Sequence, residues 1–321
     1  MNLKLVEFES ESLKDNPLKD PYKRKVAVIE PENPQGKPLI IYLSGFLSSS
    51  LSMLNYDPFS EDMKTRLERM KAEGKSNGVV MVLPDTFTKM GGNQYLNSSA
   101  VGKYEDYVME VVKTLSETYK TDKIGIMGKS SGGYGSVMIG MKHKEIRAIA
   151  DHSGDAYFEY IYIPEFPVAI ERLGRFSSWR EWFTTFWNRE TKKRRDELTT
   201  LMILAMSAFY SPRGEDVELP FSLETGEIVE DVWKRWVEKD PVRALKNYVT
   251  ALREKEVVYI DVGKRDEYNI QYGSRIIHSI LSKSGVDHVY EEFDGGHHDT
   301  SFRYDYSIAI LEKYLNDGEK Q

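Results

Sequence analysis

Short hydrophobic runs alternate along this chain with longer segments that mix polar and apolar residues. The runs are five to seven residues long and are bounded by turn residues, which is typical of strands in the interior of a sheet. The segment from Gly133 to Met141 predicts a helix. Because strands alternating with helices are typical of α/β domains, the pattern predicts an α/β fold with a mostly parallel central sheet. The predicted strands are 38–43, 123–127, 148–152, 257–263 and 288–293.

Roughly a hundred residues separate the strands 148–152 and 257–263, far more than one crossover helix needs. We therefore interpret residues 156–249 as an inserted helical cap. Residues 1–155 and 250–321 would then form the core domain. The core begins with turn-rich sequence that predicts an amino-terminal strand pair.

The predicted cap is rich in aromatic residues. A cap above the sheet would place some of these side chains in the wall of a substrate pocket. Trp182 and Trp187 are our candidates for this wall. The alternative is that the aromatic side chains form the hydrophobic core of the cap itself.

The segment Gly128-Lys129-Ser130-Ser131-Gly132 matches the pattern Gly-x-Ser-x-Gly between a predicted strand and a predicted helix. This is the context of a nucleophile elbow, whose glycines permit a strained turn that lifts the serine hydroxyl clear of the sheet. A phosphate-binding loop would need a glycine five positions before Gly128, where this chain has Lys123. Ser130 is therefore the candidate nucleophile, and the alternative is an ordinary glycine-rich turn.

Candidate acids follow the serine in the turn after strand 257–263. Asp266 lies well into that turn, where its carboxylate could orient an imidazole. Glu267 is the second choice. Asp261 is the third, because it lies inside the strand and not at its end.

The candidate general base is His297, which follows two glycines in the loop after the last predicted strand. His298 competes with it, and either residue could instead be a polar loop histidine. The chain order serine, acid, histidine is the one that an α/β-hydrolase requires. Adjacent histidines point apart on most backbones, so we expect no metal site here.

A serine nucleophile also needs donors for the oxyanion that forms during attack. The backbone N–H of Ser131, next to the nucleophile, is the first candidate. The second is the N–H of Phe46, in the Gly/Ser-rich loop after strand 38–43.

Several of these segments resemble the esterase D family, which includes S-formylglutathione hydrolases. The resemblance covers most of residues 36–155 and 255–315. It implies an α/β-hydrolase fold, with Ser130 as nucleophile, His297 as base, Asp266 as orienting acid, and Phe46 and Ser131 as oxyanion donors. The chain differs from the family at Lys129, where S-formylglutathione hydrolases usually have histidine, and in its long insertion. The similar segments are Leu43-Ser44-Gly45-Phe46, Gly128–Gly135, Val82–Asp85, Tyr95–Ser99 and Tyr104–Val108.

Composition narrows the classes of protein further. The chain has 321 residues, 40% of them hydrophobic, and no apolar run near the roughly 20 residues of a membrane-spanning helix. The amino terminus turns acidic early and lacks an apolar signal core, so we expect a cytoplasmic protein. The absence of cysteine excludes disulfides and thiolate chemistry. A net charge of −7 argues against a nucleic-acid partner, and we interpret the basic run Lys192–Arg195 as a solvated helix face.

Together these observations predict a serine carboxylesterase that acts through an acyl-enzyme without a cofactor. Thioester hydrolysis and acyl transfer use the same residues and are alternatives. A non-catalytic binding protein with this fold is a further alternative. The substrate would be a small-molecule or polymer-linked ester, and the sequence leaves open both its identity and the formation of a homo-oligomer.

Overall fold

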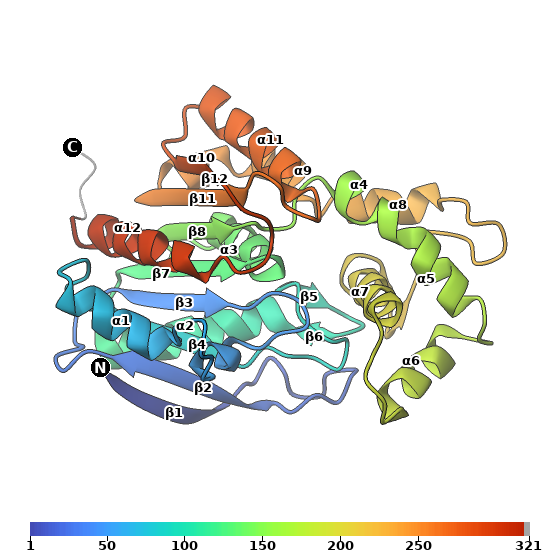
Figure 1. The fold of residues 1–321 in the computed structure, drawn as a ribbon, viewed down its shortest axis with the longest axis horizontal. Coiled ribbons are helices and arrows are strands. Elements are labelled where there is room, and N and C mark those ends of the chain that lie inside the picture. Colours follow the sequence, from blue (N-terminus) through green and yellow to red (C-terminus); the bar gives the residue numbers. More distant parts are fainter. Residues whose placement is uncertain (318–321) are drawn as a thin grey trace.

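The computed structural model describes residues 1–317 and has an eight-stranded sheet at its centre (Figure 1). The strand order is β1-β2-β4-β3-β7-β8-β11-β12, and within the described residues β2 alone runs against the other strands of this sheet. The prediction of an α/β fold with a mostly parallel sheet is confirmed. The strands are β1 (Asn2–Glu9), β2 (Lys23–Glu30), β3 (Leu39–Leu43), β4 (Val80–Pro84), β7 (Ile124–Lys129), β8 (Ala148–His152), β11 (Val257–Gly263) and β12 (Val289–Phe293).

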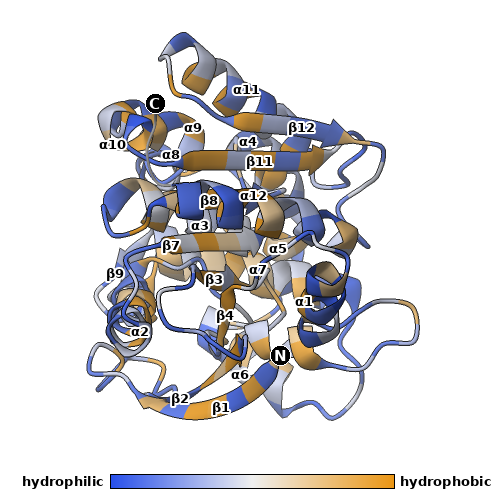
Figure 2. Ribbon diagram, turned by 90° about the vertical axis from the view of Figure 1, so that its left-hand side faces the viewer, coloured by the Kyte–Doolittle hydropathy of each residue, from blue (hydrophilic) through white to orange (hydrophobic). Residues whose placement is uncertain are grey.

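Helices cover both faces of the sheet. On one face pack α1 (Met63–Ala72) and α12 (Tyr304–Asp317), and on the other α2 (Tyr104–Tyr119), α3 (Ser131–Lys142) and α11 (Ile270–Lys283). The inner strands β3 and β4 are completely buried between these layers, and Figure 2 shows their hydrophobic character. This two-sided burial explains why these strands appear in the sequence as continuous apolar runs. The short elements of the core are η1 (Ser50–Leu54), β5 (Asn97–Ser98), β6 (Gly102–Lys103), α10 (Val249–Arg253) and η4 (Ser301–Arg303).

Residues 156–249 form a mainly helical segment, and its helices α4 to α8 lie together beside one end of the sheet (Figure 1). Aromatic side chains fill the inside of this segment: Trp236 lies 5.6 Å from Tyr162 and 5.3 Å from Tyr210 between ring centroids. The elements are α4 (Phe158–Ile161), η2 (Ile163–Glu165), α5 (Phe166–Leu173), α6 (Trp179–Asn188), α7 (Arg195–Tyr210), β9 (Pro212–Arg213), β10 (Asp216–Val217), α8 (Glu230–Val237), α9 (Pro241–Ala244) and η3 (Leu245–Asn247).

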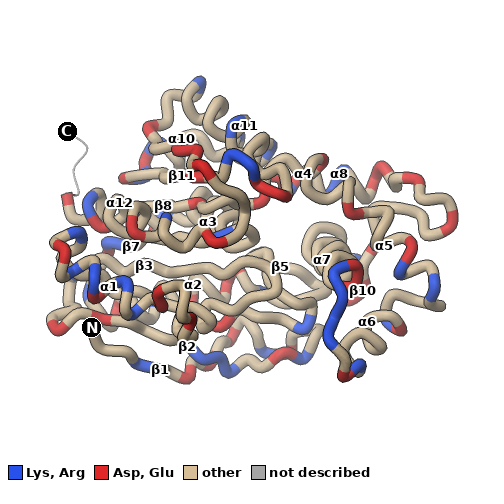
Figure 3. The backbone as a smooth tube through the Cα atoms, in the orientation of Figure 1, with Lys and Arg blue, Asp and Glu red and all other residues tan. Residues whose placement is uncertain are grey.

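Acidic and basic residues are interspersed along the backbone in Figure 3. The basic run Lys192–Arg195 is the blue stretch between α6 and α7. Most of it therefore lies in a connection, and not on a helix face as we expected, because α7 begins only at Arg195. Within residues 1–317, no helix combines the length and the apolar character needed to cross a bilayer.

The strands predicted from the sequence match observed strands to within two residues at either end. The predicted amino-terminal strand pair is also present, as the antiparallel pair β1 and β2. The helix after the elbow begins at Ser131, earlier than the predicted Gly133, because the chain turns directly from β7 into α3 at one residue.

Candidate active site

Ser130 is the single residue between β7 and α3, and its backbone has φ 57° and ψ −124°. A residue other than glycine rarely adopts a positive φ, because its side chain then crowds the backbone. Such strain persists only where the surrounding structure enforces it. Here the N–H of Ser130 donates to the carbonyl of His152 on the neighbouring strand β8 at 2.9 Å. The strain thus falls on the serine itself and not on the flanking glycines, contrary to our expectation.

The flanking glycines serve close packing instead. A Cβ atom on Gly132 would lie 2.0 Å from the carbonyl oxygen of Leu43, and one on Gly128 would lie 2.2 Å from the carbonyl oxygen of Gly132. The first turn of α3 can therefore approach the end of β3 only where no side chain intervenes. This close approach holds the start of α3 beside the carboxyl ends of β3 and β7.

We expect Gly132→Ala to destabilise the protein, because the clash is with backbone atoms that cannot move aside. Overpacked sites typically cost about 1–3 kcal/mol, which should appear as a lower midpoint in chemical denaturation. Gly36→Ala is the comparison variant, because a Cβ there meets nothing within 4 Å and its cost comes from the positive φ of 70° alone. We expect Gly132→Ala to cost more. An equal effect of both substitutions would contradict the close-packing account.

The structure brings Ser130, His297 and Asp266 together in one chain of hydrogen bonds. His297 Nε2 lies 3.0 Å from Ser130 Oγ, and its Nδ1 lies 2.7 Å from Asp266 Oδ2. The second oxygen of Asp266 accepts from the backbone N–H of Tyr268 at 2.9 Å, which fixes the carboxylate. His297 and Asp266 are both buried, so this chain of bonds is shielded from water except on the side of the serine.

The rival acids have other partners. Glu267 Oε2 accepts from the backbone N–H of His297 at 2.5 Å, so it holds the histidine loop and not the imidazole ring. Asp261 binds His152 Nδ1 at 2.7 Å and Arg303 Nε at 2.8 Å in a buried network under the sheet end. Neither carboxylate hydrogen-bonds the His297 ring.

His298, the rival base, is exposed. Its ring packs at 6.2 Å from that of Tyr268 and lies at the edge of the site. Among residues 1–317, no group of three or more His, Asp or Glu side chains is arranged to hold a metal ion.

The loop with Phe46 passes directly over the nucleophile. A Cβ on Gly45 would lie 3.3 Å from the Cβ of Ser130, and the N–H of Leu47 anchors the loop on the carbonyl of Gly91 at 2.9 Å. Ser131 is the first residue of α3, where backbone N–H groups have no partner inside the helix. Phe46 and Ser131 both line the same cavity as Ser130.

A cavity of about 490 Å³ opens at Ser130 and is walled by both the core and the segment 156–249. The helix α7 contributes Leu198, Thr199 and Met202, and the α4–η2 stretch contributes Ile161, among others. Ile161, Leu198 and Met202 give this wall apolar surface, and Glu165 and Arg195 add charged groups to it. A concave site that combines apolar walls with placed polar groups is typical of small-molecule binding.

Trp182 and Trp187 do not line this cavity, which corrects our sequence-based expectation. Trp182 is buried between α6 and α7, where it stacks on Phe186 at 5.3 Å and packs near Leu201. Trp187 is 41% exposed. The reason is that α6 packs on the side of α7 away from the cavity, and this arrangement depends on the fold of the segment and not on its composition.

Sequence reasoning missed Asp155, a buried carboxyl group in the wall of the cavity. Its Oδ2 accepts from Tyr162 Oη at 2.8 Å, and Ser131 Oγ lies 3.4 Å away. Burial raises the pKa of Asp155, opposed by its bond to Tyr162. The available signal was its position shortly after strand 148–152, at the carboxyl edge of the sheet where such sites gather.

The model of the family "Putative esterase" matches residues 21–308. No curated protein matches the chain. Among solved structures, a ferulic acid esterase aligns over 98% of each chain with 16% identity and a TM-score of 0.58. The S-formylglutathione hydrolase of Staphylococcus aureus aligns over 98% of this chain and 99% of its own with 14% identity and a TM-score of 0.56. At these identities the structural likeness shows a shared fold.

Proposed function

Because this chain belongs to the "Putative esterase" family and is a carboxylic ester hydrolase, we propose that it cleaves esters through an acyl-enzyme on Ser130. The observation that carries this proposal is the hydrogen-bonded chain from Ser130 through His297 to Asp266, at the floor of a cavity. These three groups are sufficient for acyl transfer without a cofactor.

In the first half of the reaction, Ser130 Oγ attacks the ester carbonyl carbon while its proton passes to His297 Nε2. Asp266 accepts the hydrogen bond of Nδ1–H and stabilises the imidazolium. The carbonyl oxygen becomes an oxyanion, which accepts hydrogen bonds from the backbone N–H groups of Phe46 and Ser131. The carbon–oxygen bond to the alcohol then breaks, and His297 returns the proton to the leaving oxygen.

In the second half, water takes the place of the alcohol. His297 Nε2 removes a proton from water as its oxygen attacks the acyl-enzyme carbonyl. Collapse of the second tetrahedral intermediate breaks the bond to Ser130, and His297 returns the proton to Oγ. The products are a carboxylic acid and the restored serine.

The test of this function is a panel of 4-nitrophenyl esters from acetate to palmitate, combined with a fluorophosphonate probe. We expect turnover of at least one ester and labelling confined to Ser130. A protein that hydrolysed none of the panel and escaped labelling would be better described as a binding protein.

We further propose that residues 156–249 act as a cap that sets which esters enter. Support comes from Leu198, Thr199 and Met202, which lie on the side of α7 that faces the cavity. Leu201 and Leu204 belong to the buried cluster that contains Trp182 and Phe186 of α6, and Leu198 also packs against this cluster. The helix α7 thus contributes side chains both to the wall of the cavity and to the hydrophobic core of the cap.

Met202→Ala should shift the preference in kcat/KM toward longer acyl chains, because it enlarges the cavity without touching the reacting groups. Discrimination at the scale of a methylene is about 1–3 kcal/mol, or roughly 10- to 200-fold. The ratio of kcat/KM for octanoate and acetate measures it. Trp187→Ala is the matched control in the same segment, and we expect it to leave the ratio unchanged. A shift with Trp187→Ala but none with Met202→Ala would disprove this assignment of the wall.

A further inference from the structure

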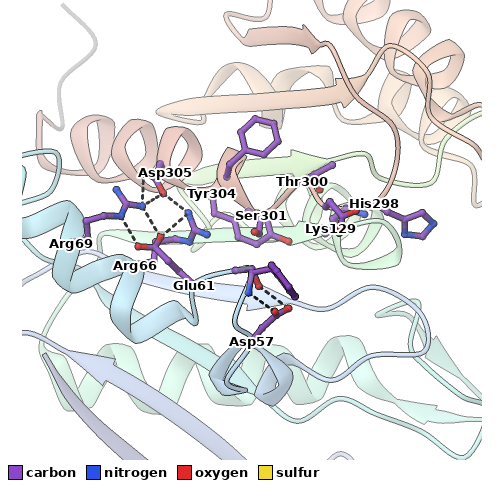
Figure 4. A pocket seen from close by; sticks show the side chains of 14 residues that line it. Asp57, Glu61, Arg66, Arg69, Lys129, His298, Thr300, Ser301, Tyr304 and Asp305 are labelled. Atoms are coloured by element: carbon purple, nitrogen blue, oxygen red, sulfur yellow. Dashed lines mark hydrogen bonds and ion pairs between the residues drawn. The ribbon is translucent and has the colours of Figure 1, made fainter.

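A second cavity, of about 800 Å³, adjoins the catalytic one. It is formed by the loop after η1, by α1 and by the segment 298–305 (Figure 4). Lys129, His298 and Tyr304 line both cavities. The boundary between the two cavities therefore includes Lys129, the residue directly before the candidate nucleophile.

Most charges of the second cavity are already paired. Arg66 and Arg69 both bind Asp305, and both lie within ion-pair distance of Glu61. Asp57 accepts from the backbone N–H of Phe59 at 2.8 Å and from Ser60 Oγ at 3.1 Å. Figure 4 shows the arginine cluster at one side and Lys129, with His298 and Thr300, at the other.

Lys129 differs from these arginines because its ammonium has no hydrogen bond or ion pair with any residue of the described range 1–317. It is largely withdrawn from water, and burial lowers its pKa to about 8. The carboxylates of Asp266, Asp155, Glu267 and Asp261 act on it only at longer range, in the opposite direction. A partly buried cation without a partner gains more from an incoming anion than a solvated one does.

We propose that Lys129 is a specificity-determining residue that binds an anionic group of the substrate, such as a carboxylate, where the two cavities meet. The inference rests on the proposed function, since it names the class of ester that Ser130 attacks. The anionic group belongs either to the acyl part or to the alcohol part of the ester. In either case it contacts the ammonium of Lys129.

Two pairs of esters test this inference, each pair with one anionic and one neutral member. On the acyl side they are 4-nitrophenyl hydrogen glutarate and 4-nitrophenyl valerate. On the alcohol side they are 4-carboxyphenyl acetate and methyl 4-acetoxybenzoate, in which a methyl group masks the carboxylate. The measured quantity is the ratio of kcat/KM, anionic over neutral, because the triad contributes equally to both members.

We expect Lys129→Met to lower this ratio about tenfold or more in one of the two pairs, and that pair identifies the anionic side. Lys129→Arg keeps the charge and should retain most of the ratio. Lys113→Met, on the exposed face of α2, is the matched control and should match the unmodified enzyme. An unchanged ratio in both pairs with Lys129→Met would overturn the inference.

The unmodified enzyme gives a second readout that needs no variant. A lysine is cationic below its pKa, so the ratio should fall as the pH rises through about 8. Asp266, Asp155, Glu267 and Asp261 act on Lys129 through their charge. The other titratable or charged groups beside it in the two cavities include Arg195, Glu165, His297, His298, Asp299 and Tyr304. A fall that persisted with Lys129→Met would belong to one of these and would count against Lys129.

Failure of the proposed function would look different. In that case the unmodified enzyme would hydrolyse neither member of either pair, and a fluorophosphonate would not label Ser130. The inference would then fall with the function. If the enzyme were labelled and active but Lys129→Met left the ratio of kcat/KM unaltered, the inference about Lys129 would be wrong and the proposed function would stand.

Discussion

Ser130→Ala should abolish ester hydrolysis, with a loss of about 10⁴- to 10⁶-fold in kcat. The reason is that Oγ is the atom 3.0 Å from His297 Nε2 and opens onto the cavity. Steady-state hydrolysis of 4-nitrophenyl acetate measures the loss, and the fluorophosphonate label should disappear with it.

The variant should fold normally, because alanine replaces only a hydroxyl and the turn is held by close packing at Gly128 and Gly132. An unchanged melting temperature is the control. Labelling of Ser131 or Ser153 would contradict the assignment. Both are buried, and Ser131 Oγ already accepts from Gln94 Nε2 at 2.7 Å.

Asp266→Asn should cost about 10⁴-fold in kcat, because an amide at this position favours the wrong imidazole tautomer. The carboxylate now accepts from His297 Nδ1–H at 2.7 Å, which leaves Nε2 free to take the proton of Ser130. An asparagine that donated to Nδ1 would place the ring proton on Nε2, where a base needs a lone pair. Comparison of kcat between the variant and the unmodified enzyme checks this.

Glu267→Gln is the matched control, since it is the neighbouring acid and also bonds to His297. Its bond goes to the backbone N–H at 2.5 Å, and a glutamine oxygen can still accept it. We therefore expect a loss far smaller than that of Asp266→Asn. If the two losses were reversed, Glu267 would be the orienting acid.

The choice between the candidate acids shows how much the sequence could predict. The turn after strand 257–263 was evident from its pattern, and Asp266 and Glu267 were both candidates there. The sequence ranked them by position only. Their different partners, one the imidazole and one the backbone of the same histidine, depend on how the loop 294–299 returns to the sheet.

The segment 156–249, our proposed cap, shows where sequence reasoning ended. Its length and aromatic content indicated an insertion near the site, but Trp182 and Trp187 were the wrong candidates for the wall. An aromatic residue packs equally well against substrate or against a neighbouring helix. The packing of α6 on the outer side of α7 made Trp182 a core residue and left the cavity to Leu198 and Met202.

The sequence by itself determined the local features: the strands of the sheet, the elbow at Ser130 and the turns that carry the candidate acids and histidines. These depend on residues close together in the chain, where hydrophobic period and turn chemistry act directly. Only the tertiary structure decided which side chains meet across long separations. Ser130 and His297 are 167 residues apart. Lys129 lines two cavities together with His298 and Tyr304, through loops that no local pattern places. Such contacts arise when strands from distant segments align their carboxyl ends at one edge of the sheet.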